Sequence, residues 1–119
     1  MRPLHVVFGA SGYIGSNLVP ELLRSGRRVR ATARNVEVLE GRGWSGVELA
    51  RADALDPATL PAVLAGVDVA YYLVHSMAAG RDFAAIDRQA AENFARAAAA
   101  AGVRRIVYLG GLIPPNPRS

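Results

Sequence analysis

The chain has 119 residues, of which 51% are hydrophobic and 20% are charged, and it contains no cysteine. This composition excludes disulfide scaffolds, thiol nucleophiles and cysteine-ligated metal sites, and the length suits one folded domain rather than two. The formal charge of +4 arises from 14 basic residues, all of them arginine, against 10 acidic ones. Such an excess suits an anionic ligand without requiring nucleic acid.

The first half of the chain predicts two strands and two helices. Residues 4–10 are largely apolar and end at glycine, which is typical of a strand buried in a parallel sheet. Residues 13–25 place apolar side chains at helical spacing and end at Ser25-Gly26, a helix stop. Residues 28–33 alternate as a strand does, and Asn35 is placed to cap a short helix over residues 36–40.

The alternation of strands and helices continues to the end of the chain. Strands are predicted at residues 46–52, 67–74 and 105–110. Asp56-Pro57 indicates the start of a helix that ends before Gly66, and residues 82–101 form a long helix with Ile86, Ala90 and Phe94 on one apolar stripe. We expect one domain over residues 1–113 and an exposed, proline-rich tail over residues 114–119.

Five strands alternating with helices predict an α/β fold, a doubly wound parallel sheet of the Rossmann type with strand order 3-2-1-4-5. In such sheets a ligand binds at the carboxyl ends of the strands, where the strand order reverses. The candidate binding segments are therefore residues 9–15 and 74–77.

Between the first strand and the first helix the chain reads G-x-x-G-x-x-G, with glycines at positions 9, 12 and 15. In this context the first glycine permits a tight turn, the second lets a pyrophosphate approach the backbone, and the third allows close packing of the helix. The helix N-terminus adds N–H groups and a positive dipole end for phosphate. The predicted cofactor-binding residues of the loop are Gly9, Ser11, Gly12, Tyr13, Ile14 and Gly15.

The end of the second strand indicates which dinucleotide is bound. NAD-specific folds place an acidic residue about 20 residues after the glycines to accept from the ribose 2′-OH. Here Arg34 stands 19 residues after Gly15, and no acid lies beside it. A guanidinium favours a 2′-phosphate, so NADP(H) is predicted rather than NAD(H). The competing interpretation of Arg34 is a solvated surface arginine.

Other strand ends supply further candidates. Asp53 could accept from an adenine amino group, or it could cap the turn that leads to Asp56-Pro57. Val74 ends the predicted fourth strand and His75 follows it, and both would face the nicotinamide side, although a non-catalytic histidine at a strand end is the favoured interpretation of His75. The arginines between residues 24 and 30 are not interleaved with aromatics, so a nucleic-acid partner is not expected.

No metal site is predicted. No apolar stretch reaches the roughly 18 residues of a membrane span, and no targeting segment is recognised. A cytoplasmic protein is therefore expected.

Taken together, these segments resemble the atypical, extended-type short-chain dehydrogenase/reductases (SDR) with NmrA-like NAD(P)H-binding domains. The resemblance covers the glycine loop, Ala33-Arg34-Asn35, Asp53-Ala54, the segment Tyr71–Met77, and the long helix with the strand after it, from Asn93 to Gly110. It implies a dinucleotide-binding Rossmann domain of an oxidoreductase, with Asp53 and Ala54 on the adenine side. The substrate would be a small molecule that the sequence does not identify.

Two departures from that family bear on activity. Family enzymes carry Ser or Thr after the fifth strand, where this chain has Gly110, Gly111 and Leu112, and the chain has no lysine to form the family's Tyr-x-x-x-Lys pair. No catalytic residue is therefore assigned. The hypotheses are a cofactor domain of a longer oxidoreductase, a non-catalytic NADP(H)-sensing module, or a truncated product. An uncovered fifth strand at Ile106, Tyr108 and Leu112 would favour a homodimer.

Overall fold

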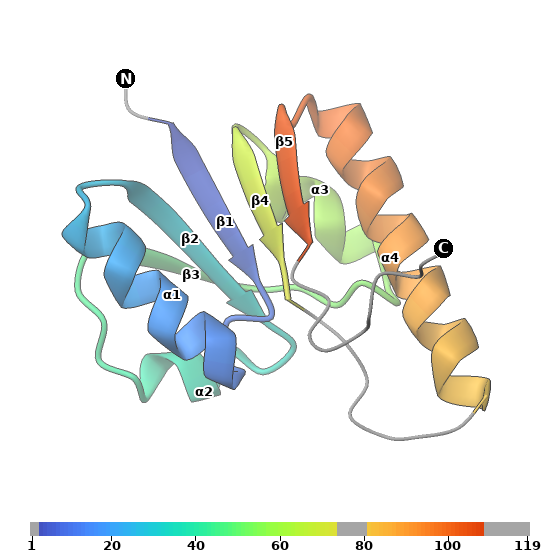
Figure 1. Cartoon of the computed structure of the whole chain (residues 1–119), viewed down its shortest axis with the longest axis horizontal. Helices are drawn as coiled ribbons and strands as arrows, with labels where there is room; N and C mark the ends of the chain where they lie inside the picture. Colours follow the sequence, from blue (N-terminus) through green and yellow to red (C-terminus); the bar gives the residue numbers. More distant parts are fainter. Residues whose placement is uncertain (1–2, 74–80, 109–119) are drawn as a thin grey trace, which may run out of the picture.

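The computed structural model describes residues 3–73 and 81–108 and shows alternating strands and helices over both ranges (Figure 1). The five strands are β1 (Leu4–Phe8), β2 (Arg28–Ala33), β3 (Val47–Arg51), β4 (Val69–Tyr72) and β5 (Arg105–Tyr108). The helices are α1 (Tyr13–Arg24), α2 (Val36–Glu40), the 3₁₀ turn η1 (Pro57–Thr59), α3 (Leu60–Leu64) and α4 (Arg81–Ala101).

All five strands form one parallel sheet in the order β3-β2-β1-β4-β5, which confirms the predicted topology. The central strand β1 is buried along its whole length and pairs with β2 on one side and β4 on the other. Every strand after β1 returns through a helix because parallel neighbours need a crossover connection. The carboxyl ends of β1, β2 and β3 therefore meet at one edge of the sheet.

The sheet separates two hydrophobic clusters. On one face, α1 and α2 cover a cluster whose buried members include Val7, Val19 and Leu39. On the other face, α3 and α4 cover a larger cluster that includes Phe8, Leu60 and Phe94. Phe8 and Phe94 lie 4.8 Å apart, centroid to centroid, in a tilted aromatic pair. Burial on both faces explains why β1 reads as a continuous apolar run rather than an alternating one.

The predicted helix ends are mostly confirmed. The Asn35 side chain accepts a hydrogen bond from the Glu37 N–H and caps α2, as its position predicts. Helix α1 ends at Arg24, and Gly26 follows with a φ of 81°, the left-handed conformation typical of a helix stop.

Several details differ from the sequence-based expectation; β4, for example, begins at Val69 and not at residue 67. The Asp56 side chain makes no cap hydrogen bond, and the turn that follows it is a 3₁₀ helix before α3 begins. Strand β1 ends at Phe8 because Gly9 turns the chain with a φ of 89°. Ile86 is exposed, so the buried stripe of α4 consists of Ala90, Asn93, Phe94 and Ala98.

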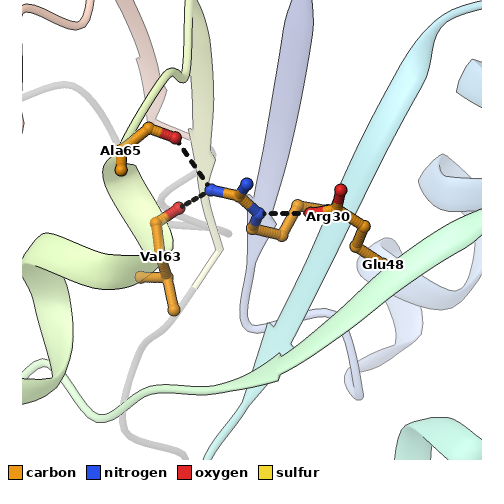
Figure 2. A network of polar contacts seen from close by, with 4 residues as sticks. All are labelled: Arg30, Glu48, Val63 and Ala65. Atoms are coloured by element: carbon orange, nitrogen blue, oxygen red, sulfur yellow. Dashed lines mark hydrogen bonds and ion pairs between the residues drawn. The ribbon is translucent and has the colours of Figure 1, made fainter.

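Arg30 links the sheet to α3 (Figure 2). From β2, its Nε donates to Glu48 Oε1 on β3 at 2.7 Å, and its Nη1 donates to the carbonyls of Val63 and Ala65 at 2.8 and 3.0 Å. The last carbonyls of a helix lack partners within the helix itself. The partly buried guanidinium of Arg30 donates to two such carbonyls of the short helix α3. These hydrogen bonds fix α3 against the sheet.

His5 is a buried titratable group at the amino-terminal end of the sheet. Its ring stacks on Tyr71 at 5.8 Å, and its Nε2 is buried with no hydrogen-bond partner among the described residues. Burial lowers the pKa of His5, the nearby Arg27 lowers it further, and Asp68 opposes both effects. The folded protein therefore holds His5 uncharged.

Acid is expected to weaken the fold through this histidine. Because its folded-state pKa lies below the ordinary value of 6.5, His5 stabilises the fold fully above that pH, and this contribution is lost as the pH falls toward the folded-state pKa. Urea denaturation from about pH 7.5 to about pH 5.5 should show a steeper fall in the free energy of unfolding for wild type than for His5→Phe. Equal slopes for the two proteins would contradict this assignment.

None of the helices in the described ranges has the length and apolar character needed to cross a membrane.

Candidate functional site

The loop from Gly9 to Gly15 is folded over the carboxyl ends of β1 and β2. The Gly9 and Ala10 N–H groups both donate to the Thr32 carbonyl, at 3.2 and 2.9 Å. Gly9 adopts a φ of 89°, which a residue with a side chain rarely takes. The loop is thus fixed by its main chain at the edge where ligands bind in doubly wound sheets.

Gly15 lies where the first turn of α1 touches the loop. A Cβ placed there would come within 2.6 Å of the Ala10 Cα. Contact this close leaves no room for any side chain, so the helix can approach the loop only because residue 15 is glycine. This is the packing role that the sequence pattern predicts for the third glycine.

Gly12 is in a different situation. Its φ of −78° and ψ of 178° are extended backbone that any residue adopts. A Cβ there would meet nothing closer than the Gly9 carbonyl oxygen, at 3.8 Å. Neither the fold nor the backbone conformation requires glycine at this position. The space beside Gly12 is open, as a site for an approaching phosphate group has to be.

The N-terminus of α1 faces the same loop. Ser16 is the first helical residue whose N–H reaches back to Gly12, at 2.9 Å, so the N–H groups of residues 13–15 have no partner within the helix. Such N–H groups and the helix dipole attract anions. The side chain of Tyr13 is 86% exposed and that of Ile14 40% exposed. Both lie in a shallow depression on the outer surface of α1, lined also by Leu18 and Arg24.

A second, smaller depression lies between the loop and the end of β2. It has a volume of about 320 Å³ and is lined by Ser11, Arg34, Asn35 and Val38. Arg34 is exposed, and within residues 3–73 and 84–108 no acidic side chain pairs with it. The structure therefore places the predicted Arg34 beside the predicted Ser11, with an unneutralised guanidinium at the opening.

Arg42 is a residue of this region that sequence reasoning missed. Its Nη2 donates to the Ser11 carbonyl at 2.8 Å and so ties the segment after α2 to the glycine loop. The two residues are 31 positions apart, and no local pattern connects them. The one available signal is that Arg42 follows a short helix that starts right after Arg34, which returns the chain toward the same edge.

The Asp53 side chain closes a turn. Its Oδ1 accepts from the Leu55 N–H at 2.9 Å, which agrees with the turn-capping interpretation of the sequence. The turn also lies next to Arg34, because the Ala52 N–H donates to the Ala33 carbonyl at 3.1 Å. One carboxylate oxygen of Asp53 is thus used in the turn, and the residue lies at the carboxyl-terminal edge of the sheet.

Tyr72, at the carboxyl end of β4, packs in an aromatic cluster with Phe8, Phe94 and Tyr108. Burial, together with the smaller effects of the neighbouring Asp87 and Tyr108, raises the pKa of Tyr72 to about 12. The hydroxyl stays protonated at neutral pH and donates a proton poorly. Tyr72 is therefore a packing residue.

The contacts predicted after β4, Val74 and His75, lie outside the described residues, as do Gly110, Gly111, Leu112 and the predicted tail. Across residues 3–73 and 81–108, no three His, Cys, Asp or Glu side chains gather in a group that could hold a metal ion.

The chain is similar in sequence to an NAD(P)H-binding family and to a reductase. A family described as NAD(P)H-binding matches residues 9–113. Cinnamoyl-CoA reductase 1 of Oryza sativa subsp. japonica is 36% identical to the chain over 125 aligned residues, which cover 98% of the chain and 37% of that protein.

Solved structures show the same fold. The Citrobacter sp. triphenylmethane reductase complexed with NADP(H) superposes with a TM-score of 0.76 at 28% identity, over 89% of the chain and 37% of that structure. An Escherichia coli NADPH-dependent quinone oxidoreductase complexed with NADPH gives a TM-score of 0.74 at 26% identity, over 87% and 35%. The chain spans little more than a third of the length of these relatives.

Proposed function

The chain belongs to the NAD(P)H-binding family, and from this premise we propose that it binds NADP(H) as the cofactor domain of an oxidoreductase. The carrying observation is the depression lined by Ser11, Arg34, Asn35 and Val38, which opens beside the glycine loop and presents an arginine that has no acidic partner in the part of the chain that the structure describes. A guanidinium forms charge-assisted hydrogen bonds with a doubly charged phosphate. A neutral 2′-hydroxyl is bound better by an acidic residue than by an arginine.

The rest of the loop suits the pyrophosphate. The open side of Gly12 admits it, and the partnerless N–H groups at the start of α1 would donate to its oxygens. The adenosine half would then lie across the ends of β2 and β3, with Asp53 and Ala54 on the adenine side. The nicotinamide half would point toward Val74 and His75. When bound, the reduced cofactor would supply a hydride, and the residues of this chain would bind and orient the cofactor.

Arg34→Ala is the direct test. Loss of charge-assisted hydrogen bonds worth roughly 1.5–3 kcal/mol should weaken NADPH and 2′,5′-ADP binding by about 10- to 100-fold, while NADH affinity stays nearly constant. Calorimetric titration measures the affinities for NADPH, 2′,5′-ADP and NADH. It is done at low and at moderate salt, because screening reduces the contribution of the arginine as the salt concentration rises.

Arg104→Ala is the matched control. It removes the same charge at the opposite edge of the sheet, where Arg104 pairs with Asp68 at 3.7 Å while 70% exposed, so little stability is lost. It should bind all three ligands as wild type does. Equal binding of NADPH and NADH by the wild-type chain would overturn the NADP(H) preference.

A non-catalytic NADP(H)-sensing domain is the second candidate. It would hold the cofactor with the same glycine loop and the same Arg34, and would differ only in that no substrate is reduced. Oxidation of NADPH by this chain with any of a panel of carbonyl substrates would exclude the sensing domain, since such a domain binds NADPH without consuming it.

A further inference from the structure

Asn93 is a polar residue on the buried stripe of α4, between apolar neighbours. It is only 6% exposed and lies next to Phe94, which is fully buried in the larger hydrophobic cluster. An amide in such a place costs free energy unless its hydrogen bonds are made. Both of its ends are bonded. Nδ2 donates to the Ala54 carbonyl at 2.8 Å, and Oδ1 accepts from Gln89 Nε2 at 2.8 Å.

The Ala54 carbonyl belongs to the turn at residues 53–55, which is held at two further points. Asp53 Oδ1 accepts from the Leu55 N–H at 2.9 Å. The Thr59 hydroxyl accepts from the Asp53 N–H at 3.0 Å and lies 3.0 and 2.8 Å from the carbonyls of Asp53 and Asp56. These bonds are local in sequence. The bond from Asn93 spans 39 residues and attaches the turn to another helix.

The attachment matters because of where the turn lies. The chain leaving β3 crosses the sheet toward α3 and α4 (Figure 1), and Ala54 packs into the cluster with Phe8 and Phe94. At its other end the turn is bonded next to Arg34, through the Ala52 N–H and the Ala33 carbonyl. A ligand whose 2′-phosphate meets Arg34 would therefore place its purine base against Asp53 and Ala54.

We infer that Asn93 is a positioning residue for this purine site: by holding the Ala54 carbonyl it sets the position of the Asp53 carboxylate, and thereby the preference for an aminopurine over an oxopurine. The inference rests on the proposed function. Asn93 does not touch the base. It acts through the turn, where a shift of well under an ångström changes the length of a hydrogen bond to the exocyclic group.

The probe is reduced nicotinamide hypoxanthine dinucleotide phosphate, which differs from NADPH by a carbonyl oxygen in place of the adenine amino group and by the hydrogen that N1 then carries. A carboxylate accepts from the amino group and repels the oxygen, so the wild-type chain should bind NADPH at least about tenfold more tightly than this analogue. In Asn93→Leu, which removes the donor at similar volume, the preference should fall below about threefold. The ratio of NADPH to NADH affinity should stay at its wild-type value, because Arg34 is unchanged.

Asn93→Ser is the second variant, since its short hydroxyl cannot reach the Ala54 carbonyl and its small size is easily accommodated. Gln89→Leu is the control, because it removes the partner of Oδ1 and leaves the bond to Ala54 in place; it should keep the tenfold preference. Thermal melts establish that each variant is folded.

The outcomes are distinguishable. If Asn93 were only a structural residue, its replacement would lower the affinities for NADPH and for the hypoxanthine analogue by the same factor. The ratio of the two affinities would then not change, and this result would overturn the inference. A wild-type chain that binds NADPH without discriminating against the analogue would overturn it as well. A folded wild-type chain that binds no NADPH would instead overturn the proposed function itself.

Discussion

Replacing Gly15 with alanine is expected to lower the free energy of unfolding by roughly 2 kcal/mol. The added Cβ would lie 2.6 to 2.8 Å from three atoms of Ala10, all of them main-chain atoms that no rotamer change can move away. Overpacking of this severity costs about 3 kcal/mol, and the better helix propensity of alanine returns at most about 1 kcal/mol. The melting temperature should fall by roughly 10 °C.

The matched control for this prediction is Gly41→Ala, the same chemical change at the end of α2. Gly41 has a φ of −68°, and a Cβ there would lie 3.5 Å from the Val38 carbonyl oxygen, an ordinary contact. Alanine should be tolerated or should raise stability by about 0.5 kcal/mol. Thermal or urea denaturation of both variants measures the difference. If Gly15→Ala were as stable as Gly41→Ala, the tight approach of α1 to the loop would be refuted.

Gly12→Val is expected to give the opposite pattern, a folded chain that has lost its ligand. The extended backbone at Gly12 accommodates valine, and the first protein atom that its Cβ meets is 3.8 Å away. At a helix N-cap this exchange costs at most about 1 kcal/mol of stability. The new methyl groups would occupy the space proposed for the pyrophosphate, so NADPH and NADH affinity should both fall more than about tenfold.

Calorimetric titration and a melting curve on the same sample check this prediction. Gly12→Ala should show a smaller loss of affinity in the same direction, because it adds one methyl group. Gly12→Val is expected to lose affinity for both cofactors, whereas Arg34→Ala is expected to lose affinity for NADPH alone. The two variants therefore report on different parts of the dinucleotide. Wild-type affinity in Gly12→Val would show that the phosphates bind elsewhere.

The sheet and its strand order were predictable because each signal is local. Glycines and prolines mark the ends of the elements, and parallel strands joined by right-handed crossovers leave few topologies. Asn35 was predicted as a cap from its position and is one. Asp56-Pro57 suggested a helix start equally well, yet Asp53, three residues earlier, supplies the side chain that closes the turn. Two aspartates before one proline give the same local signal, and tertiary contacts decide which of them is used.

The candidate site was only partly predictable. The glycine loop and Arg34 were predictable from their spacing along the chain, and the structure brings Ser11 and Arg34 to one depression. Arg42 and Asn93 reach this edge from distant segments through bonds that span 31 and 39 residues. Asn93 did leave a trace in the sequence, since a polar residue three positions after Ala90 falls on the apolar stripe of its helix. The pattern gives no indication of what the amide binds.

The loop between β1 and α1 is shaped by its main chain: Gly9 and Ala10 donate to one carbonyl of β2, and the N–H groups that start α1 have no partner within the helix. A cradle of this kind depends little on which side chains stand at Ser11, Tyr13 or Ile14. In the proposed binding mode, natural variation can therefore exchange those residues freely. In the same proposed mode, the choice between the two dinucleotides would depend on one exposed side chain at the end of β2, so cofactor usage could evolve by single substitutions that leave the folded scaffold intact.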